Sequence, residues 1–393
     1  MTARRVLVSG YGALTGFGLG AACLRRALFD GEHAFVPVTR FETGAYRSKL
    51  AAQSSYPHDE LAACIDCASE ALRMSGCDPA NAAILLGTSG DIAALDRFWS
   101  QSRDTGAAVD DALRSVPGVM VESVARALGI RGRRLAFTNA CVASTSALAY
   151  AGELISSGRD ETVVCGGSSL LSQVFFALFD AGRAMSPRGR LRPFARHRDG
   201  LLLGDGVAFL VLESEQHLRE RRGTALAELA GWGISSDAFH VCQPDPSGQG
   251  LARAAQQALR RAGIEPHAVG YVNAHGTGTP LNDRAESNAL RLVFGEQASH
   301  VPLSSTKGAT GHTLEAAGAV EAVIGVLALT EHKLPPCVGY EEPDPECGAL
   351  DLVTTTRAAL ALDNVLSLNA AFGGVNAALL LRRAPQPSWE AAP

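Results

Sequence analysis

Cys141 is the first candidate for chemistry, because it falls where an apolar segment meets a helical pattern. Residues 134–138 are predicted to form a strand, and residues 142–157, rich in Ala, Ser and Gly, to form a helix. At the first turn of a helix, free N–H groups and the positive end of the helix dipole favour a thiolate, the nucleophilic form of cysteine. The same N–H groups can stabilise an oxyanion on a thioester carbonyl. Taken alone, the pattern is also typical of a buried cysteine that only fills space.

Two histidines occur at similar junctions and strengthen the case for catalysis. His275 follows an apolar strand, Gly270–Asn273, and precedes a turn of Gly and Thr residues. His312 lies between a strand, Val301–Ser305, and a second helix rich in small residues. Each histidine by itself fits a buried structural role equally well. Three such junctions at one edge of the sheets would bring a thiol and two imidazoles together, which is the geometry of a catalytic site.

The elements that must position these residues follow a simple order. Short apolar segments alternate with helical patterns along the chain, which predicts an α/β architecture with mixed or parallel sheets. The predicted strands are Arg5–Ser9, Ala83–Gly87, Arg134–Thr138, Glu161–Val164, Val207–Glu213, Ala225–Gly231, Gly270–Asn273, Val301–Ser305 and Val365–Asn369. The predicted helices include Asp59–Met74, Val119–Leu128, Ser144–Ser157, Gly250–Ala262 and Glu315–Glu331. The helices that follow Cys141 and His312 are expected to be buried between layers, because their side chains are small on every face.

The chain is expected to divide into two similar halves. Residues 1–213 form the first half, which carries Cys141, and residues 224–383 form the second, which carries both histidines. A charged and polar connection joins them. Residues 384–393 hold three prolines and little material for a core, so we expect a flexible tail.

Composition excludes several classes of protein. The 393 residues are 47% hydrophobic, enough for a large core, and the net charge of −5 argues against nucleic acid as a partner. No apolar run approaches the roughly 20 residues of a membrane span, and the N-terminus does not have the pattern of a signal peptide. We therefore expect a soluble, cytoplasmic protein.

The sequence predicts neither a metal nor a nucleotide cofactor. Cys64 and Cys67 form a C-x-x-C pair inside a helical stretch, but no second pair of ligands lies nearby, so we interpret them as packing residues. The glycines in residues 10–16 do not have the G-x-G-x-x-G spacing of a dinucleotide loop.

Motifs throughout the chain together resemble those of one family. These motifs are Asn139-Ala140-Cys141, Met185-Ser186-Pro187, Arg192-Pro193-Phe194, Arg198-Asp199-Gly200, Gly204-Asp205-Gly206, Asn273-Ala274-His275-Gly276-Thr277, Lys307 to His312, Ala316 to Glu321, and Phe372-Gly373-Gly374-Val375-Asn376. With them the chain resembles the β-ketoacyl-acyl carrier protein synthases, the elongating type I/II ketosynthases of the thiolase-like superfamily.

The resemblance implies a five-layered αβαβα fold of two similar halves, in a protein that is usually a dimer. It also implies a decarboxylative Claisen condensation. Cys141 would accept an acyl group as a thioester, and His275 and His312 would stabilise the enolate formed when malonyl-acyl carrier protein loses carbon dioxide. The N–H groups of Cys141 and Phe372 would form an oxyanion hole, each donor being worth roughly 3–4 kcal/mol.

Further roles follow from the resemblance. Lys307 would act electrostatically, through an ion pair with Glu321. Thr277 and Thr279 would bind the phosphopantetheine arm, although capping the turn is an equally good role for them. Substrates would arrive on the phosphopantetheine of an acyl carrier protein, with no cofactor bound. The chain would form a homodimer, or a heterodimer with a subunit resembling chain-length factors.

Two departures from the family pattern stand out. The family usually has Phe-Gly-Phe-Gly-Gly near its C-terminus, where this chain has Ala370-Ala371-Phe372-Gly373-Gly374. Ala371 would restrict the backbone if a positive φ is needed there. We therefore expect Ala370, Ala371 and Phe372 to form a gate that moves differently or opens a wider pocket. Glu315 replaces the usual glycine, and the sequence offers no reason for it.

Several alternatives remain open at this point. A degradative thiolase would add a second catalytic Cys, and an initiating synthase would have Asn in place of His312, so both fit less well. A non-catalytic subunit resembling chain-length factors would usually lack Cys141. We favour a specialised type II polyketide or polyene pathway over primary fatty acid elongation. Acyl chain length cannot be derived, because residues 101–117 match no family motif.

Overall fold

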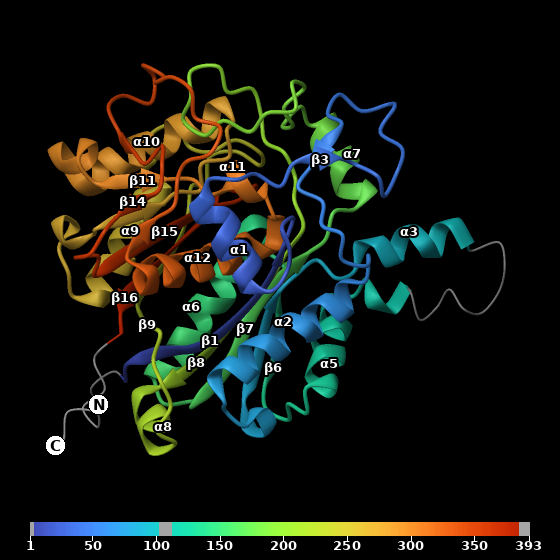
Figure 1. The fold of residues 1–393 in the computed structure, drawn as a ribbon, viewed down its shortest axis with the longest axis vertical. Helices are drawn as coiled ribbons and strands as arrows, with labels where there is room; N and C mark the ends of the chain where they lie inside the picture. The colour runs from blue at the N-terminus through green and yellow to red at the C-terminus, as the bar shows by residue number, and fades with distance from the viewer. Residues whose placement is uncertain (1–3, 102–111, 385–393) are drawn as a thin grey trace.

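A mixed sheet of twelve strands runs through residues 4–101 and 112–384, which the computed structural model describes (Figure 1). The strand order is β13-β11-β10-β15-β16-β9-β1-β8-β7-β5-β6, and β2 pairs with β1. The first half contributes β1 (Val6–Thr15), β2 (Gly18–Leu19), β5 (Ala83–Gly87), β6 (Arg134–Phe137), β7 (Thr162–Ser169) and β8 (Gly206–Ser214). The second half contributes β9 (Ala227–Ser236), β10 (Tyr271–Asn273), β11 (Pro302–Ser304), β13 (Asp351–Leu352), β15 (Asn364–Ala370) and β16 (Val375–Arg383). Two small two-stranded sheets pair β3 (Val36–Pro37) with β4 (Leu50–Ala51) and β12 (Lys333–Leu334) with β14 (Arg357–Ala358).

The two halves of the sheet repeat one strand order. Read toward the middle of the sheet, the first half has the order β6-β5-β7-β8-β1 and the second half β11-β10-β15-β16-β9. In both halves the third of these strands along the chain is followed by the second, fourth, fifth and first, and the second half adds β13 outside β11. The halves meet where β1 pairs with β9, at Leu7 with Glu228 and Val8 with Ala227. A short helix, α8 (Glu215–Glu220), lies in the predicted connection. The exact division at residues 213 and 224 stays a prediction, and residues 385–393 of the expected tail lie outside the described residues.

Two helices with small side chains form the central layer (Figure 1). α6 (Ala143–Ser156) and α12 (Ala317–Glu331) each contact strands of both halves. Small residues permit this close packing, since a Cβ added to Gly318 of α12 would lie 1.9 Å from Thr145 Oγ1 of α6. Both helices are almost entirely buried, as the sequence predicts.

Other helices cover the outer faces (Figure 1). α2 (Glu60–Ser75) and α5 (Pro117–Ala127) pack on the first half, while α9 (Gln249–Ala262) and α10 (Pro280–Phe294) pack on the second. Cys64 and Cys67 lie on the buried face of α2 as free thiols. Further helices of the described residues are α1 (Ala21–Asp30), α3 (Ile92–Gln101), α7 (Gln173–Ala181) and α11 (Lys307–Thr310).

Within the described part of the chain, no helix is long and apolar enough to cross a membrane. The same residues contain no group of three or more His, Cys, Asp and Glu side chains arranged to hold a metal ion.

Candidate active site

The three predicted junctions meet in the interior of the molecule. Cys141 lies in a 3-10 turn, η2 (Ala140–Val142), directly after β6, and His312 follows α11. The Nε2 atom of His312 is 3.1 Å from the Sγ atom of Cys141. The ring of His275 stands at 87° to that of His312, with 5.4 Å between the ring centroids. All three side chains are buried, so the convergence expected from the sequence is present.

Backbone turns place two of these groups. Ala140 has a φ of 54° immediately before Cys141, and Leu314 has a φ of 47° shortly after His312. Neither is glycine, and each such conformation costs on the order of 1–3 kcal/mol, which is typical of functional sites. The turn at Ala140 is what directs the chain from β6 into the helix that carries the thiol.

Burial sets the protonation of the site. It raises the pKa of Cys141 to about 12, with Glu315 acting in the same direction and Lys307 against it. Burial also lowers the pKa of His275 and of His312 well below the usual value, and Lys307 adds to this. The histidines are therefore neutral. The raised pKa of the thiol contradicts the expectation that the helix N-terminus favours a thiolate, because burial disfavours the charged form in the unacylated protein.

A buried ion pair belongs to the framework around the active site. Lys307 Nζ contacts Glu321 Oε1, which is the pairing expected from the sequence. Glu321 Oε2 accepts a hydrogen bond from Asn369 Nδ2 at 2.6 Å, and Asn369 Oδ1 accepts one from Thr145 at 2.7 Å. This chain of contacts joins α11, α12, β15 and α6, the elements that surround Cys141. Removing one partner of such a pair would leave a buried charge uncompensated.

The turn after His275 is held by acids that the sequence did not reveal. Glu286 of α10 accepts hydrogen bonds from the backbone N–H groups of His275 and Gly276, both at 2.7 Å. Asp283, on the same helix, accepts one from Gly278 N at 3.2 Å and one from Phe194 N at 2.8 Å. The backbone of His275 is therefore fixed by buried carboxyl groups.

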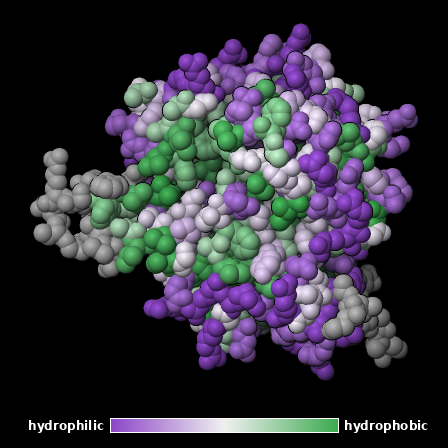
Figure 2. Space-filling model, turned by 180° about the vertical axis from the view of Figure 1, so that it is seen from behind, coloured by the Kyte–Doolittle hydropathy of each residue, from purple (hydrophilic) through white to green (hydrophobic). Residues whose placement is uncertain are grey.

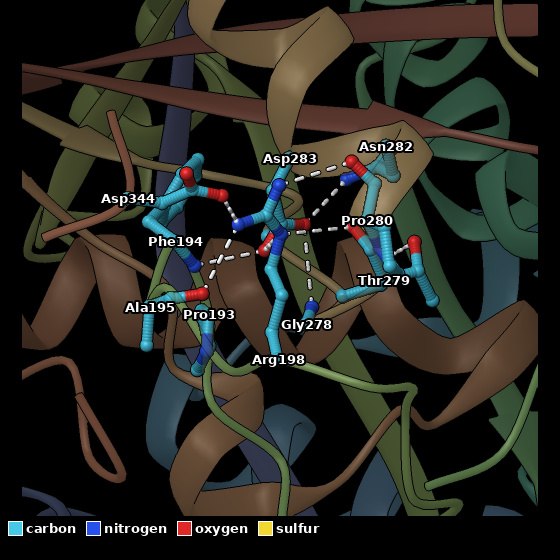
Figure 3. Close-up of polar contacts among 12 residues, drawn as sticks. Pro193, Phe194, Ala195, Arg198, Gly278, Thr279, Pro280, Asn282, Asp283 and Asp344 are labelled. Atoms are coloured by element: carbon cyan, nitrogen blue, oxygen red, sulfur yellow. Dashed lines mark hydrogen bonds and ion pairs between the residues drawn. The ribbon is translucent and has the colours of Figure 1, made fainter. Parts of the chain in front are cut away.

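Arg198 locks the far side of the same turn (Figure 3). Its guanidinium contacts Asp344 and lies 3.5 Å from Asp283 Oδ2. It also donates hydrogen bonds to the carbonyl oxygens of Thr279 at 3.3 Å and Pro280 at 3.1 Å. The resemblance contained this arginine only as part of a motif, and the structure gives it a positioning function.

Thr277 and Thr279 lie together at the end of this turn. Their hydroxyl oxygens are 2.8 Å apart, and Thr279 is the N-cap residue of α10 but makes no side-chain capping bond. The capping alternative is therefore not realised by Thr279. Binding of phosphopantetheine by this pair stays a prediction.

The expected gate follows β15. Ala371 donates a hydrogen bond to Val375 O at 2.8 Å, and Gly373 donates one to Val241 O at 2.8 Å. Among the backbone hydrogen bonds of the described residues, none is donated by the N–H of Phe372. Its place in an oxyanion hole stays a prediction. The Phe372 ring is 48% exposed and stacks on Phe179, with 5.5 Å between the centroids.

The backbone of the gate corrects one expectation. Ala371 does not have a positive φ; the left-handed residues are Gly373, at 87°, and Gly374, at 75°. Glycine is thus retained at the two positions that need it, and Ala371 causes no strain. A wider pocket beside Ala370, which is half-buried at the end of β15, stays a prediction.

Comparison with known proteins now defines the class. The layered α/β fold and the site are those of condensing acyltransferases with a thiolase-like fold. Family models described as the N-terminal and C-terminal domains of beta-ketoacyl synthase match residues 58–217 and 226–341. The chain belongs to the β-ketoacyl synthase family, and the predicted family and fold class are confirmed.

Relatives of similar length cover nearly the whole chain. A tetracenomycin polyketide synthase ketoacyl synthase alpha subunit from Streptomyces glaucescens is 35% identical over 97% of this chain and 97% of its own. A 3-oxoacyl-[acyl-carrier-protein] synthase 2 from Coxiella burnetii is 31% identical over 98% of this chain and 99% of its own. The solved ishigamide ketosynthase/chain length factor matches with a TM-score of 0.91 and 29% identity, over 98% of this chain and 100% of its own.

Proposed function

We propose that this ketosynthase works in a specialised type II polyketide or polyene pathway, where it extends an acyl chain held on Cys141. The single observation that carries the catalytic assignment is the contact between His312 Nε2 and Cys141 Sγ, with neutral His275 beside it. The pathway is supported by the similarity to the tetracenomycin subunit and to the ishigamide ketosynthase.

The reaction begins with acyl transfer. The Cys141 sulfur attacks the thioester carbonyl of an acyl carrier protein, and the carrier's thiol leaves. His312 Nε2 lies within reach of the Cys141 proton, which must be removed because the pKa of the buried thiol is about 12. The proton passes through His312 to the sulfur of the leaving carrier, so His312 is neutral again after acyl transfer. The N–H groups of Cys141 and Phe372 stabilise the oxyanion of the tetrahedral intermediate.

Condensation follows when the malonyl thioester binds. The bond between its C2 and its carboxylate breaks, carbon dioxide leaves, and the electron pair moves into an enolate whose oxygen is hydrogen-bonded by His275 and His312. The enolate carbon then attacks the acyl carbonyl on Cys141, and the sulfur leaves as a thiolate that is reprotonated. Neutral imidazoles suit this role as donors, and burial keeps both in that state. Lys307 and Glu321 hold the framework around them.

The partners follow from the same assignment. Acyl carrier protein delivers both substrates on phosphopantetheine, in the cytoplasm, and a solved neighbour is described as a type II PKS acyl-carrier protein in complex with its ketosynthase. Another is a ketosynthase in complex with its chain length factor from Xenorhabdus doucetiae, matching with a TM-score of 0.81 and 30% identity over 97% of this chain and 98% of its own.

A dimer surface fits the edge of the first half. β6 is the last strand of the sheet, so its outer side is unpaired within the described chain. Figure 2 shows hydrophobic residues gathered on one side of the molecule. Leu113 and Val116 of the first half are exposed. This edge can receive a second copy or a chain-length-factor-like subunit.

Three other functions are weaker. Primary fatty acid elongation uses the same chemistry and fits the Coxiella burnetii relative. A non-catalytic subunit would not need the complete set of Cys141, His275 and His312. A degradative thiolase would need a second Cys at the site, whereas Cys347 belongs to a different core cluster from Cys141.

Intact-protein mass spectrometry with a panel of acyl carrier proteins tests the proposal. We expect an acyl group to appear on the wild-type protein and to be absent from Cys141→Gln, which should still decarboxylate malonyl-acyl carrier protein. Failure of every donor to label the protein, together with absence of decarboxylation, would refute an enzymatic function. Condensation that survives in Cys141→Gln would show that the nucleophile is another residue.

A further inference from the structure

Asp205 is a buried acid whose role is not evident from its motif, Gly204-Asp205-Gly206. Its fully buried carboxyl group accepts hydrogen bonds from Arg40 Nη1 at 2.6 Å and from Arg40 Nη2 at 2.7 Å. It also accepts one from Leu171 N and two from Ser54, through the N–H and the hydroxyl group, each at 2.8 Å. Donors from three separate segments of the chain thus converge on one side chain. Such a fully satisfied buried network makes the surrounding backbone rigid.

The segment that ends at Asp205 holds the backbone of His312. The N–H of His312 donates a hydrogen bond to Leu202 O at 2.8 Å, and the carbonyl oxygen of His312 accepts one from Gly204 N at 3.1 Å. Both backbone groups of this histidine are therefore bound by one segment. The two segments also pack tightly, since a Cβ added to Gly204 would lie 2.2 Å from Thr310 O. A shift of the segment that carries Asp205 would therefore be transmitted to His312.

The imidazole of His312 depends on this support of its backbone. Its Nε2 lies 3.1 Å from Cys141 Sγ, while its buried Nδ1 makes no hydrogen bond to any described residue. In many enzymes a hydrogen bond to the other ring nitrogen orients a catalytic histidine. Within the described part of the chain His312 has no such bond, so its backbone and the packing around the ring determine where Nε2 lies.

We propose that Asp205, held by Arg40, is a positioning residue that keeps His312 Nε2 within reach of the Cys141 thiol. Asp205 acts through the backbone of His312 and not through its ring. Loss of this hold would displace the base that removes the proton from Cys141. This inference rests on the proposed function, because it requires acyl transfer to Cys141.

Variants that weaken the network in steps test the proposal. Ser54→Ala removes one hydrogen bond, Arg40→Lys replaces a guanidinium that binds both carboxyl oxygens by a single ammonium group, and Asp205→Asn removes the charge and one acceptor. Acyl transfer from octanoyl pantetheine thioester is followed by intact-protein mass spectrometry, and Cys141→Gln measures labelling at other thiols. We expect the maximum rate to fall in this order, by about 100-fold in Asp205→Asn, the scale of a small misplacement of a catalytic group. The donor concentration that gives half the maximum rate should stay unchanged.

The pH dependence separates positioning from a general structural role. In the wild type neutral His312 accepts the proton, so the rate should be nearly constant between pH 7.5 and 8.5. Without a well-placed base the reaction depends on thiolate, whose population rises about tenfold per pH unit below the pKa of about 12. The rate of Asp205→Asn should therefore rise about tenfold over this range. The charged groups that act on the thiol or on His312 are unchanged in every variant; they are Lys307, Glu315 and Glu321.

Asp351→Asn provides the matched control. Asp351 also accepts two hydrogen bonds from one guanidinium, that of Arg357, but it lies on β13, at the outer edge of the second half. We expect this variant to keep the wild-type rate and pH dependence.

Two results would overturn the positioning function of Asp205. One is labelling of Asp205→Asn at the wild-type rate. The other is a loss by the same factor at every pH, which would indicate a smaller fraction of folded protein. If Asp205→Asn does not fold, Arg40→Lys must show the same change in pH dependence to a smaller degree, and its absence would overturn the proposal. Failure to label the wild type would refute the proposed function, and this inference with it.

Discussion

Asp283 and Glu286 lie one turn apart on α10, and their carboxyl groups accept N–H groups from the two ends of the turn that begins at His275. Glu286 binds His275 and Gly276 at 2.7 Å each, and Asp283 binds Gly278 at 3.2 Å. Through these two side chains, α10 holds the loop that begins at His275 in place. It holds the backbone from which the imidazole of His275 projects.

Replacing Glu286 should slow decarboxylation more than acyl transfer. In Glu286→Ala we expect decarboxylation of malonyl-acyl carrier protein to fall about 100-fold, the scale of a small misplacement of a catalytic group. Acyl transfer onto Cys141 should fall much less, because it depends on His312 and the oxyanion donors. Carbon dioxide release and intact-protein mass spectrometry measure the two steps separately. Equal losses in both would indicate general misfolding instead of a misplaced His275.

The same residue predicts a pH dependence. Burial raises the pKa of Glu286 to about 7, whereas the pKa of His275 and of His312 is well below its usual range. Above pH 7 Glu286 is a carboxylate that holds both N–H groups strongly. Below pH 7 it becomes protonated and this hold weakens. Decarboxylation should therefore decrease as the pH falls through about 7.

A Glu286→Gln variant shows whether Glu286 is the group that titrates near pH 7. Decarboxylation is measured from pH 6 to 8 in the Cys141→Gln background, so that the thiol does not contribute. We expect the inflection near pH 7 to disappear when Glu286→Gln is added. An inflection that persists in the double variant would mean that a histidine titrates in this range, contrary to its lowered pKa.

The sequence predicted those strands and helices whose apolar residues follow a regular spacing. Of the predicted strands, Ala83–Gly87 agrees to the residue with β5, and the two central helices agree within one or two residues. The polar helix α10 was missed, although Thr279-Pro280 is a recognisable helix start. β16 was also missed, because the glycines before it favoured a loop.

Long-range contacts account for the rest of the site. Cys141, His275 and His312 were found because each lies at a visible junction between elements. Glu286 and Asp283 lie on the helix that begins at Pro280, shortly after His275 in the sequence. Recognising this helix start would have pointed to both acids. The contact between Arg198 and Asp344 joins distant loops, and nothing in the local sequence predicts it. Ser89 is likewise remote from Glu315, so their hydrogen bond is visible only in the structure.

Substitutions at Ala371 and Gly373 test which residue of the gate needs a flexible backbone. Ala371 does not have a positive φ, whereas Gly373 has a φ of 87°. Ala371→Gly should therefore lower the free energy of unfolding only slightly, by about 0.4–1 kcal/mol, through the greater entropy of the unfolded chain. Gly373→Ala should cost more, about 1–2 kcal/mol, because a Cβ is strained in a left-handed conformation.

Urea unfolding of the two variants beside the wild type measures both effects. Open space surrounds Gly373, with nothing within 4 Å of an added Cβ, so its loss of stability reports backbone strain and not a clash. A gain of stability in Ala371→Gly would show that residue 371 is strained as alanine. In that case the glycine that the family usually has at position 371 would stabilise the gate at rest, as well as allowing the gate to move.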